Sequence, residues 1–179
     1  IKKSVLIIFV LSIALSDIIL SQIYEVKQFS ISSASMQDAL MKGDRVIAGK
    51  DIESINRGYI VIFKLSDSPG ERTYVKRVIG LPGEEIQIKD NSAYINGTKL
   101  DEKYAVSTAK KYDSDEALFD IKSENNYGPN VIPKDNYFML GDNRNNSHDS
   151  RHYGTVPKDK ITGKVYKIIW PLERAGAVK

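Results

Sequence analysis

The sequence predicts a mainly β domain that follows one apolar N-terminal segment. Short runs rich in β-branched and aromatic residues recur along the chain, and pairs of Gly, Asn, Asp or Pro residues separate them. Helical periodicity is missing after residue 25, where 36–41 forms at most a short turn of helix. These three observations favour an all-β fold for the part of the chain that follows the apolar segment.

Seven strands are expected from this pattern. The predicted strands are 45–48, 59–64, 73–79, 85–89, 93–95, 137–140 and 162–170. The predicted turns are Pro82-Gly83, Asp90-Asn91, Asn96-Gly97 and Gly141-Asp142. The segment near 101–130 is polar and interrupts the series, so it is expected to be a small insert within a domain of residues 25–179.

Residues 1–24 differ in character from the rest. Lys2 and Lys3 precede an apolar run, 4–24, which reaches the roughly 20 residues that a bilayer requires. The two lysines place the start of the run in the cytoplasm. The pattern leaves two interpretations open, a signal peptide cleaved near 14–16 and a retained anchor that tolerates Asp17. In both, the residues after about Tyr24 lie outside the cytoplasm.

Composition excludes several classes of site. The 179 residues include no cysteine, which rules out disulfides, cysteine-based zinc sites and a thiol nucleophile. The net charge of +3 is spread along the chain, which argues against nucleic acid as a partner. The two histidines, His148 and His152, permit a Ser-His-Asp triad or a His/Asp metal site, but solvated loop histidines are favoured. A metal site is therefore not favoured by these residues, and the family resemblance described below implies neither a metal nor an organic cofactor.

A lysine inside an apolar strand is the first candidate for chemistry. Lys76 lies among Val75, Val78 and Ile79, and a buried ammonium is costly unless it has a use. Burial lowers the pKa of a lysine, and the neutral amine can then activate a serine. The serine-rich run 30–40 could supply that serine. The alternatives are that Lys76 points to water and that the serine run is a flexible linker.

Residues 141–154, called the GDNR loop below, form the second candidate. The loop alternates charged residues with small polar ones, and Asp–Arg pairs could hold it rigid without helix or sheet. Its charged candidates are Asp142, Arg144, Asp149 and Arg151. The alternative is a surface loop with scattered ion pairs of little energy.

These segments, in this order behind an apolar N-terminus, resemble the bacterial type I signal peptidases, which are Ser/Lys membrane proteases. Ser35-Met36 with Leu40 resembles the nucleophile motif, usually Ser-Met-x-Pro-Thr-Leu. The other matching segments are "VIAGKDIESINRGYIVIFK" (46–64), "YVKRVIGLPGE" (74–84) and "GDNRNNSHDSRHYGTVP" (141–157). The single anchor and short insert are similar to the Gram-positive branch.

The resemblance implies a role for each site residue. Ser35 would be the nucleophile and Lys76 its general base, while Ser147 would orient the lysine amine. The amide of Ser35 and the hydroxyl of Ser33 would form the oxyanion hole, and Met36 would line the pocket for a small substrate side chain. Asp142, Arg144, Asp149 and Arg151 would be the scaffold of the loop.

The resemblance also implies the fold, the substrates and the location. Two antiparallel sheets would form the catalytic domain, a fold shared with self-cleaving repressors, and residues 1–24 would be a retained transmembrane helix. The substrates would be exported preproteins with Ala-x-Ala sites, cut at the outer face of the bacterial cell membrane. The partners are thus signal peptides and the lipid bilayer.

The chain departs from the family pattern in the nucleophile motif. Asp38 stands where the family has Pro, and Ala39 where it has Thr. Loss of proline loosens the turn, and a carboxylate near Lys76 would raise the pKa of that lysine. The alternative function is therefore a catalytically impaired relative that binds or assembles exported proteins, for example those of pili. Retention of Ser35 and Lys76 favours the active peptidase.

Overall fold

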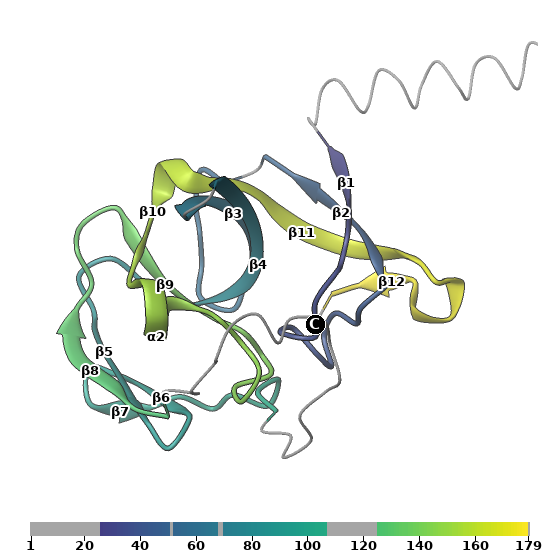
Figure 1. Ribbon diagram of the computed structural model, residues 1–179. Helices are drawn as coiled ribbons and strands as arrows, with labels where there is room; N and C mark the ends of the chain where they lie inside the picture. Colours follow the sequence, from purple (N-terminus) through teal and green to yellow (C-terminus); the bar gives the residue numbers. More distant parts are fainter. Residues whose placement is uncertain (1–25, 51, 68–69, 107–124, 179) are drawn as a thin grey trace, which may run out of the picture.

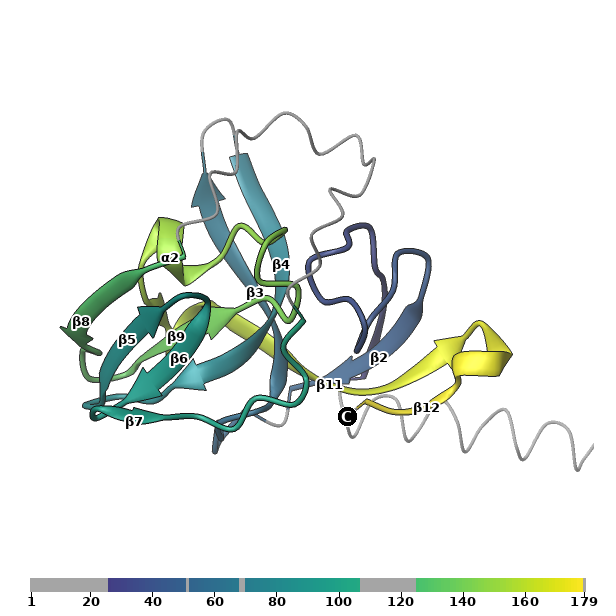
Figure 2. The ribbon, with the colours of Figure 1, turned by 90° about the horizontal axis from the view of Figure 1, so that it is seen from below.

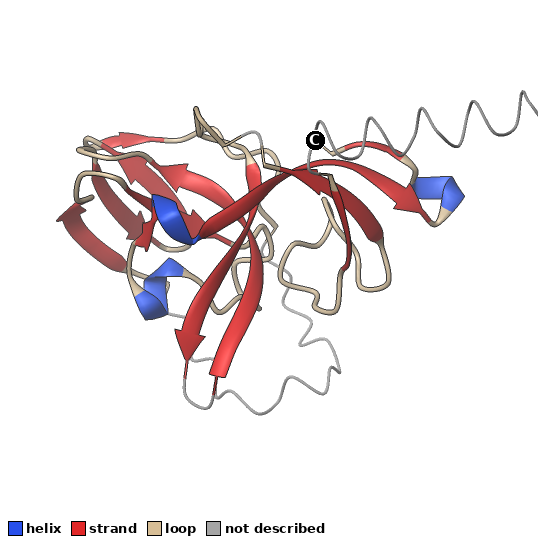
Figure 3. Ribbon diagram, turned by 90° about the horizontal axis from the view of Figure 1, so that it is seen from above, coloured by secondary structure: helices blue, strands red, loops and turns tan. Residues whose placement is uncertain are grey.

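The computed structural model describes residues 26–50, 52–67, 70–106 and 125–178. The predicted anchor, 1–24, lies outside these residues. None of the helices within the described part of the chain is both long and apolar enough to cross a membrane. Strands are the main regular structure of the described residues, and loops and a few very short helices join them (Figure 3).

The larger sheet has eight antiparallel strands. They run in the order β1-β2-β11-β3-β4-β9-β10, and β12 pairs with β11. Their bounds are β1 Lys27–Ser30, β2 Arg45–Gly49, β3 Ile60–Asp67, β4 Gly70–Gly80, β9 Asn136–Leu140, β10 Val156–Pro157, β11 Ile161–Trp170 and β12 Gly176–Ala177. β11 runs across the molecule between β2 and β3 (Figure 1).

The smaller sheet has four antiparallel strands in the order β7-β6-β5-β8. Their bounds are β5 Glu85–Lys89, β6 Ser92–Ile95, β7 Thr98–Lys99 and β8 Tyr127–Val131. It lies beside β9, at one end of the molecule (Figures 1 and 2). The prediction of a mainly β fold with two antiparallel sheets is confirmed.

Turn chemistry explains the smaller sheet. Asp90 and Asn91 both have positive φ, 47° and 64°, as do Asn96 and Gly97, at 48° and 77°. Two consecutive residues of this kind make the tight hairpin turn whose twist matches that of paired strands. Both turns were predicted from the residue types, and they set the registers of β5 with β6 and of β6 with β7.

All seven predicted strands are present, but five others escaped prediction. β1, β7, β10 and β12 are short, and short strands carry little periodic signal. β8 contains Gly128 and Pro129 and lies at the edge of its sheet, where a proline is tolerated. Residues 127–130 of the predicted insert therefore belong to a strand, while 107–124 lie outside the described residues.

Alternating side chains bury the core in three clusters. In β5, Ile86 and Ile88 are buried while Glu85 and Lys89 are exposed. The cluster that concerns the site packs β2, β3 and β11 against Met36 and Leu40 of the β1–β2 connection. The helices among the described residues are α2 Ser150–Tyr153, η1 Lys158–Lys160 and η2 Leu172–Arg174. α2 is a difference from the sequence analysis, which expected the GDNR loop to contain no helix.

Candidate active site

A groove of about 370 Å³ lies between the β1–β2 connection and β4. Ser33, Ser35 and Met36 line it from the connection, and Lys76 lines it from β4. In Figure 2 the connection stands beside β2 and faces the β3–β4 hairpin. The structure thus brings together two segments that are 41 positions apart in the chain.

Ser35 and Lys76 meet in this groove. The Nζ atom of Lys76 lies 2.5 Å from Oγ of Ser35. Both side chains belong to buried residues, with exposures of 5% for Ser35 and 4% for Lys76. Removal of an amine from water disfavours its charged form. The arrangement can therefore place a hydroxyl proton within reach of an amine lone pair.

Ser33 lies beside the pair. Its Oγ is 3.1 Å from Oγ of Ser35, and the Ser35 amide donates to it at 3.5 Å. The Ser33 hydroxyl and the Ser35 amide therefore lie side by side but bond to each other, and their role as oxyanion donors stays a prediction. Met36 is buried in the core cluster and also lines the groove, while its predicted contact with a small substrate side chain stays a prediction.

Ser147 reaches the site through Gly141. A Cβ atom on Gly141 would overlap Oγ of Ser147 and would lie 2.5 Å from the carbonyl oxygen of Ser35. Glycine at 141 thus lets the GDNR loop pack against the backbone of Ser35. Oγ of Ser147 is buried and acts on the Asp149 carboxylate, whose pKa it helps to lower, so its lysine-orienting role stays a prediction.

Asn143 is a site residue that the sequence analysis missed. Its amide donates to the carbonyl of Ser35 at 3.1 Å, and its side chain donates to the carbonyl of Ala34 at 3.3 Å. The backbone on both sides of the Ala34–Ser35 peptide is thereby held from the GDNR loop. Asn143 lies within the GDNR loop, but only the charged residues of that loop were candidates, and the Asn143 side chain is neutral.

An ion pair joins the GDNR loop to β4. Arg77, next to Lys76, donates to both carboxylate oxygens of Asp142, at 2.8 and 2.7 Å. Arg77 also stacks on Tyr104, with its guanidinium carbon 4.2 Å from the ring centre. Burial raises the pKa of Asp142, while Arg77 and Arg144 act to lower it. This pair fixes the start of the loop beside the lysine.

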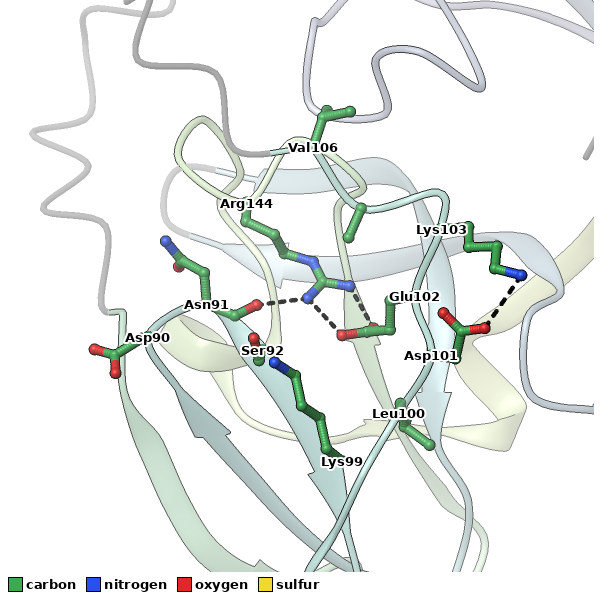
Figure 4. Close-up of a pocket in the computed structure, with 11 residues that line it drawn as sticks. Asp90, Asn91, Ser92, Lys99, Leu100, Asp101, Glu102, Lys103, Val106 and Arg144 are labelled. Atoms are coloured by element: carbon green, nitrogen blue, oxygen red, sulfur yellow. Dashed lines mark hydrogen bonds and ion pairs between the residues drawn. The ribbon is translucent and has the colours of Figure 1, made fainter.

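Arg144 joins the loop to the smaller sheet (Figure 4). It donates to both oxygens of Glu102, at 3.1 and 2.5 Å, and to the carbonyls of Asn91 and Gly141. Arg144 is 1% exposed, so these bonds replace the water that a guanidinium would otherwise bind. This position lets Arg144 support the loop, and its predicted scaffold role stays a prediction.

Asp149 and Arg151 hold the second half of the loop. Asp149 accepts from Arg151 at 2.9 Å through both Nε and Nη2, and from the amide of Gly141 at 3.1 Å. Asp149 is also the N-cap of α2, in a capping box with His152. Burial acts to raise the pKa of Asp149, but Arg151 and the Gly141 amide lower it below its ordinary value.

The histidines lie together at the edge of the groove. The rings of His148 and His152 are 4.8 Å apart, and His148 is one of the groove-lining residues. No group of three or more His, Cys, Asp or Glu residues among those described could hold a metal ion. The described residues that line the groove do not include Asp38, which is exposed.

Comparison with known proteins agrees with these motifs. The family model described as signal peptidase, peptidase S26, matches residues 1–170. A probable signal peptidase I-2 of Synechocystis is 37% identical, over 82% of this chain and 64% of its own length. Signal peptidase IB of Staphylococcus aureus strain N315 is 37% identical, over 94% of this chain and 92% of its own.

A solved structure is also similar in part. It is the crystal structure of a signal peptidase I from Enterococcus faecalis V583, 33% identical, with a TM-score of 0.44. The similarity covers 63% of this chain and 97% of that one. From the match of the family model and the identity to the curated relatives, the chain belongs to the signal peptidase family, peptidase S26.

Proposed function

We propose that this protein is a serine endopeptidase that removes N-terminal signal peptides from exported preproteins with a Ser35–Lys76 dyad. The observation that carries the proposal is the contact of 2.5 Å between Nζ of Lys76 and Oγ of Ser35, buried at the base of a groove. Membership of the signal peptidase family supports the reaction. The exposed position of Asp38 supports an active dyad, because its carboxylate faces solvent.

The acylation step follows from the geometry. The neutral amine of Lys76 takes the proton of Ser35 as Oγ bonds to the scissile carbonyl carbon. The negative oxygen that forms would be stabilised by the amide of Ser35 and the hydroxyl of Ser33. When the peptide bond breaks, the Lys76 ammonium gives its proton to the leaving amine. The signal peptide is then an ester of Ser35.

Deacylation returns the enzyme to its starting state. Lys76, neutral again, takes a proton from a water molecule as that water attacks the ester carbonyl. The ester bond breaks and Ser35 recovers the proton from Lys76. The products are the mature protein, with a new amino terminus, and the signal peptide, with a new carboxylate.

The substrate and location form part of the same proposal. Met36 lines the groove, where it would select small substrate side chains of the Ala-x-Ala kind. Residues 1–24 would be a single-pass anchor in the bacterial cell membrane, with the N-terminus in the cytoplasm and residues 25–179 at the outer face. Lys2, Lys3 and the apolar run after them support this orientation.

The test is cleavage of a preprotein with an Ala-x-Ala site by the detergent-solubilised protein, read by mass spectrometry. The unaltered protein should cut at that site. Ser35→Ala should abolish cleavage because it removes the nucleophile. Lys76→Arg should abolish it too, because a guanidinium stays protonated and cannot act as a base.

Circular dichroism of each variant would show that the fold is kept. Full cleavage by Lys76→Arg would contradict the dyad. Absence of cleavage by the folded, unaltered protein would favour the alternative of a non-catalytic binding or assembly factor. No contact among the described residues favours that alternative now.

A further inference from the structure

The segment that carries Ser35 is a closed loop, residues 31–44, called the nucleophile loop below. Its ends are joined by hydrogen bonds from the Ile31 amide to the Asp44 carbonyl and from the Gly43 amide to the Ile31 carbonyl, both 2.8 Å. Within it, the Leu40 amide donates to the Met36 carbonyl at 2.7 Å. The loop therefore forms one short turn after Ser35 and then returns to β2.

A single side chain from the C-terminal part of the chain binds the second half of this loop. Arg174, the last residue of η2, donates through Nη2 to the carbonyls of Asp38 and Ala39, both at 3.3 Å. The same guanidinium binds the carboxylate of Asp44 through Nε, at 3.1 and 3.2 Å, and through Nη2, at 3.0 Å. One residue thus joins the turn and the base of the loop.

Asp44 fixes the guanidinium in place. Asp44 is 1% exposed, and its Oδ2 also accepts from the Met41 amide at 2.8 Å. Its backbone amide donates to the Met41 carbonyl at 3.0 Å. An arginine anchored on a buried carboxylate loses less freedom when it makes further hydrogen bonds, because its fork of donors is planar.

The opposite side of the loop is held by the GDNR loop. Asn143 binds the carbonyls of Ala34 and Ser35, as described above. Met36 and Leu40 anchor the floor of the loop in the core. The side of the turn that neither the GDNR loop nor the core holds carries the carbonyls of Asp38 and Ala39. Neither residue restricts its own φ as proline would, so the stiffness of this side has to come from another contact.

We propose that Arg174, held by Asp44, is a positioning residue for Ser35. The proposal rests on the peptidase function proposed above. Arg174 clamps the turn that follows the nucleophile and so narrows the positions that Oγ can take against Lys76. Small displacements of reacting groups cost up to about 10²-fold in rate. Arg174 and the residues it binds do not line the groove, so loss of the clamp should act on the chemical step more than on substrate binding.

The experiment is steady-state cleavage of the Ala-x-Ala preprotein by full-chain Arg174→Gln and Arg174→Lys. We expect Arg174→Gln to lower kcat about tenfold with KM within about twofold, since positioning is lost and binding is kept. Lysine can keep a positive charge beside the Asp44 carboxylate but lacks the planar fork of donors. Arg174→Lys should therefore also lose most of kcat.

Arg57→Gln is the matched control. Arg57 is also a half-buried arginine with a carboxylate partner, Glu84, at 2.6 Å, and its side chain is 28% exposed against 34% for Arg174. It lies in none of the contacts of the nucleophile loop. Its loss should cost similar stability and leave kcat unchanged. Equal losses of kcat in Arg57→Gln and Arg174→Gln would reduce Arg174 to a general stabilising residue and overturn the proposal.

Rescue by proline gives the second measurement. Asp38→Pro restricts φ within the turn, so it should restore most of kcat to Arg174→Gln while adding little to the unaltered protein. A normal kcat in Arg174→Gln would refute the clamp, and so would a lowered kcat that Asp38→Pro does not restore.

A third readout does not depend on activity. In a Ser35→Ala background, Arg174→Gln should speed amide hydrogen exchange within 36–44 and leave β5 unchanged. Unchanged exchange in that segment would also count against the clamp. If the unaltered protein failed to cut, the proposed function would fail while this exchange experiment still tested the contact.

Discussion

At the scale of single residues, the cost of burying Lys76 is the central fact. A lysine is rarely buried unless it is paired, and Lys76 is 4% exposed within a strand of the larger sheet. The contact of its Nζ atom with Oγ of Ser35 supplies a hydrogen-bond partner for the buried amine. The apolar neighbours of Lys76 left two interpretations open, burial or exposure to water, and the structure shows burial. The partner was not readable from the neighbours, because it comes from the other side of the groove.

Gly141 sets how closely the GDNR loop can approach Ser35. Gly141→Ala should lower the rate of preprotein cleavage at least about tenfold, because the added Cβ would displace Ser147 and the Ser35 carbonyl. Gly70→Ala is the control, since its Cβ would meet no atom within 4 Å. Both variants would be compared by kcat and by thermal unfolding. A Gly141→Ala protein with full activity would show that the loop can shift without moving Ser35.

At the scale of elements, the GDNR loop connects the two sheets. Arg77 of β4 binds Asp142 at one end of the loop, and Arg144 binds Glu102, which follows β7. Two buried ion pairs therefore fix a segment that has only four residues of helix. The sequence predicted Asp–Arg pairs within the loop, which Asp149 and Arg151 form, but not that Asp142 and Arg144 would pair with residues outside it.

Loss of the Arg144 pair should be costly. Arg144→Leu leaves the carboxylate of Glu102 buried without its cation, so unfolding free energy should fall by about 3–5 kcal/mol. Arg144→Leu combined with Glu102→Leu should recover a large part of this loss, because no lone charge then remains. Urea unfolding of the three proteins measures both effects. Additive losses in the double variant would mean that the two side chains do not interact.

Elements were predictable where local signals agree. The hairpin turns at Asp90-Asn91 and Asn96-Gly97 pair turn chemistry with alternating strands, and both formed as expected. β8 was missed because a Gly-Pro pair usually ends a strand, and only its edge position makes the pair acceptable. α2 was missed because four residues show no period, and its start depends on the capping box of Asp149.

At the scale of the whole molecule, stability should depend on acid through Asp149. Burial acts to raise its pKa, but Arg151 and the Gly141 amide lower it below 3.8. A lowered pKa contributes stability that is present above the unfolded value and is lost as pH falls through the folded one. The pKa of Asp142 is raised, mainly by burial, so ionisation of this group lowers stability as pH rises above 3.8. Unfolding free energy should therefore fall on acidification below about pH 4.

The comparison with Asp149→Asn isolates this group. Asparagine keeps the size and one accepting oxygen, but it cannot ionise. The stability difference between the two proteins should be largest near neutral pH and should shrink as pH falls below about 4. Denaturant unfolding over a pH series measures it. A difference that stays constant down to the lowest pH would place the acid sensitivity elsewhere.

The sequence by itself determined the class of fold, the two segments that carry the proposed dyad and the charged residues of the GDNR loop. These follow from local properties: side-chain period, turn chemistry and the cost of a lysine among apolar residues. Residue properties left the partner of Lys76 open, and tertiary structure brings it to Ser35, as the family resemblance implies. Tertiary structure alone decided that Asn143 and Arg174 hold the nucleophile loop from two sides and that Asp38 is exposed. Arg174 and Asp38 are 136 positions apart, and no local pattern records which distant elements pack together.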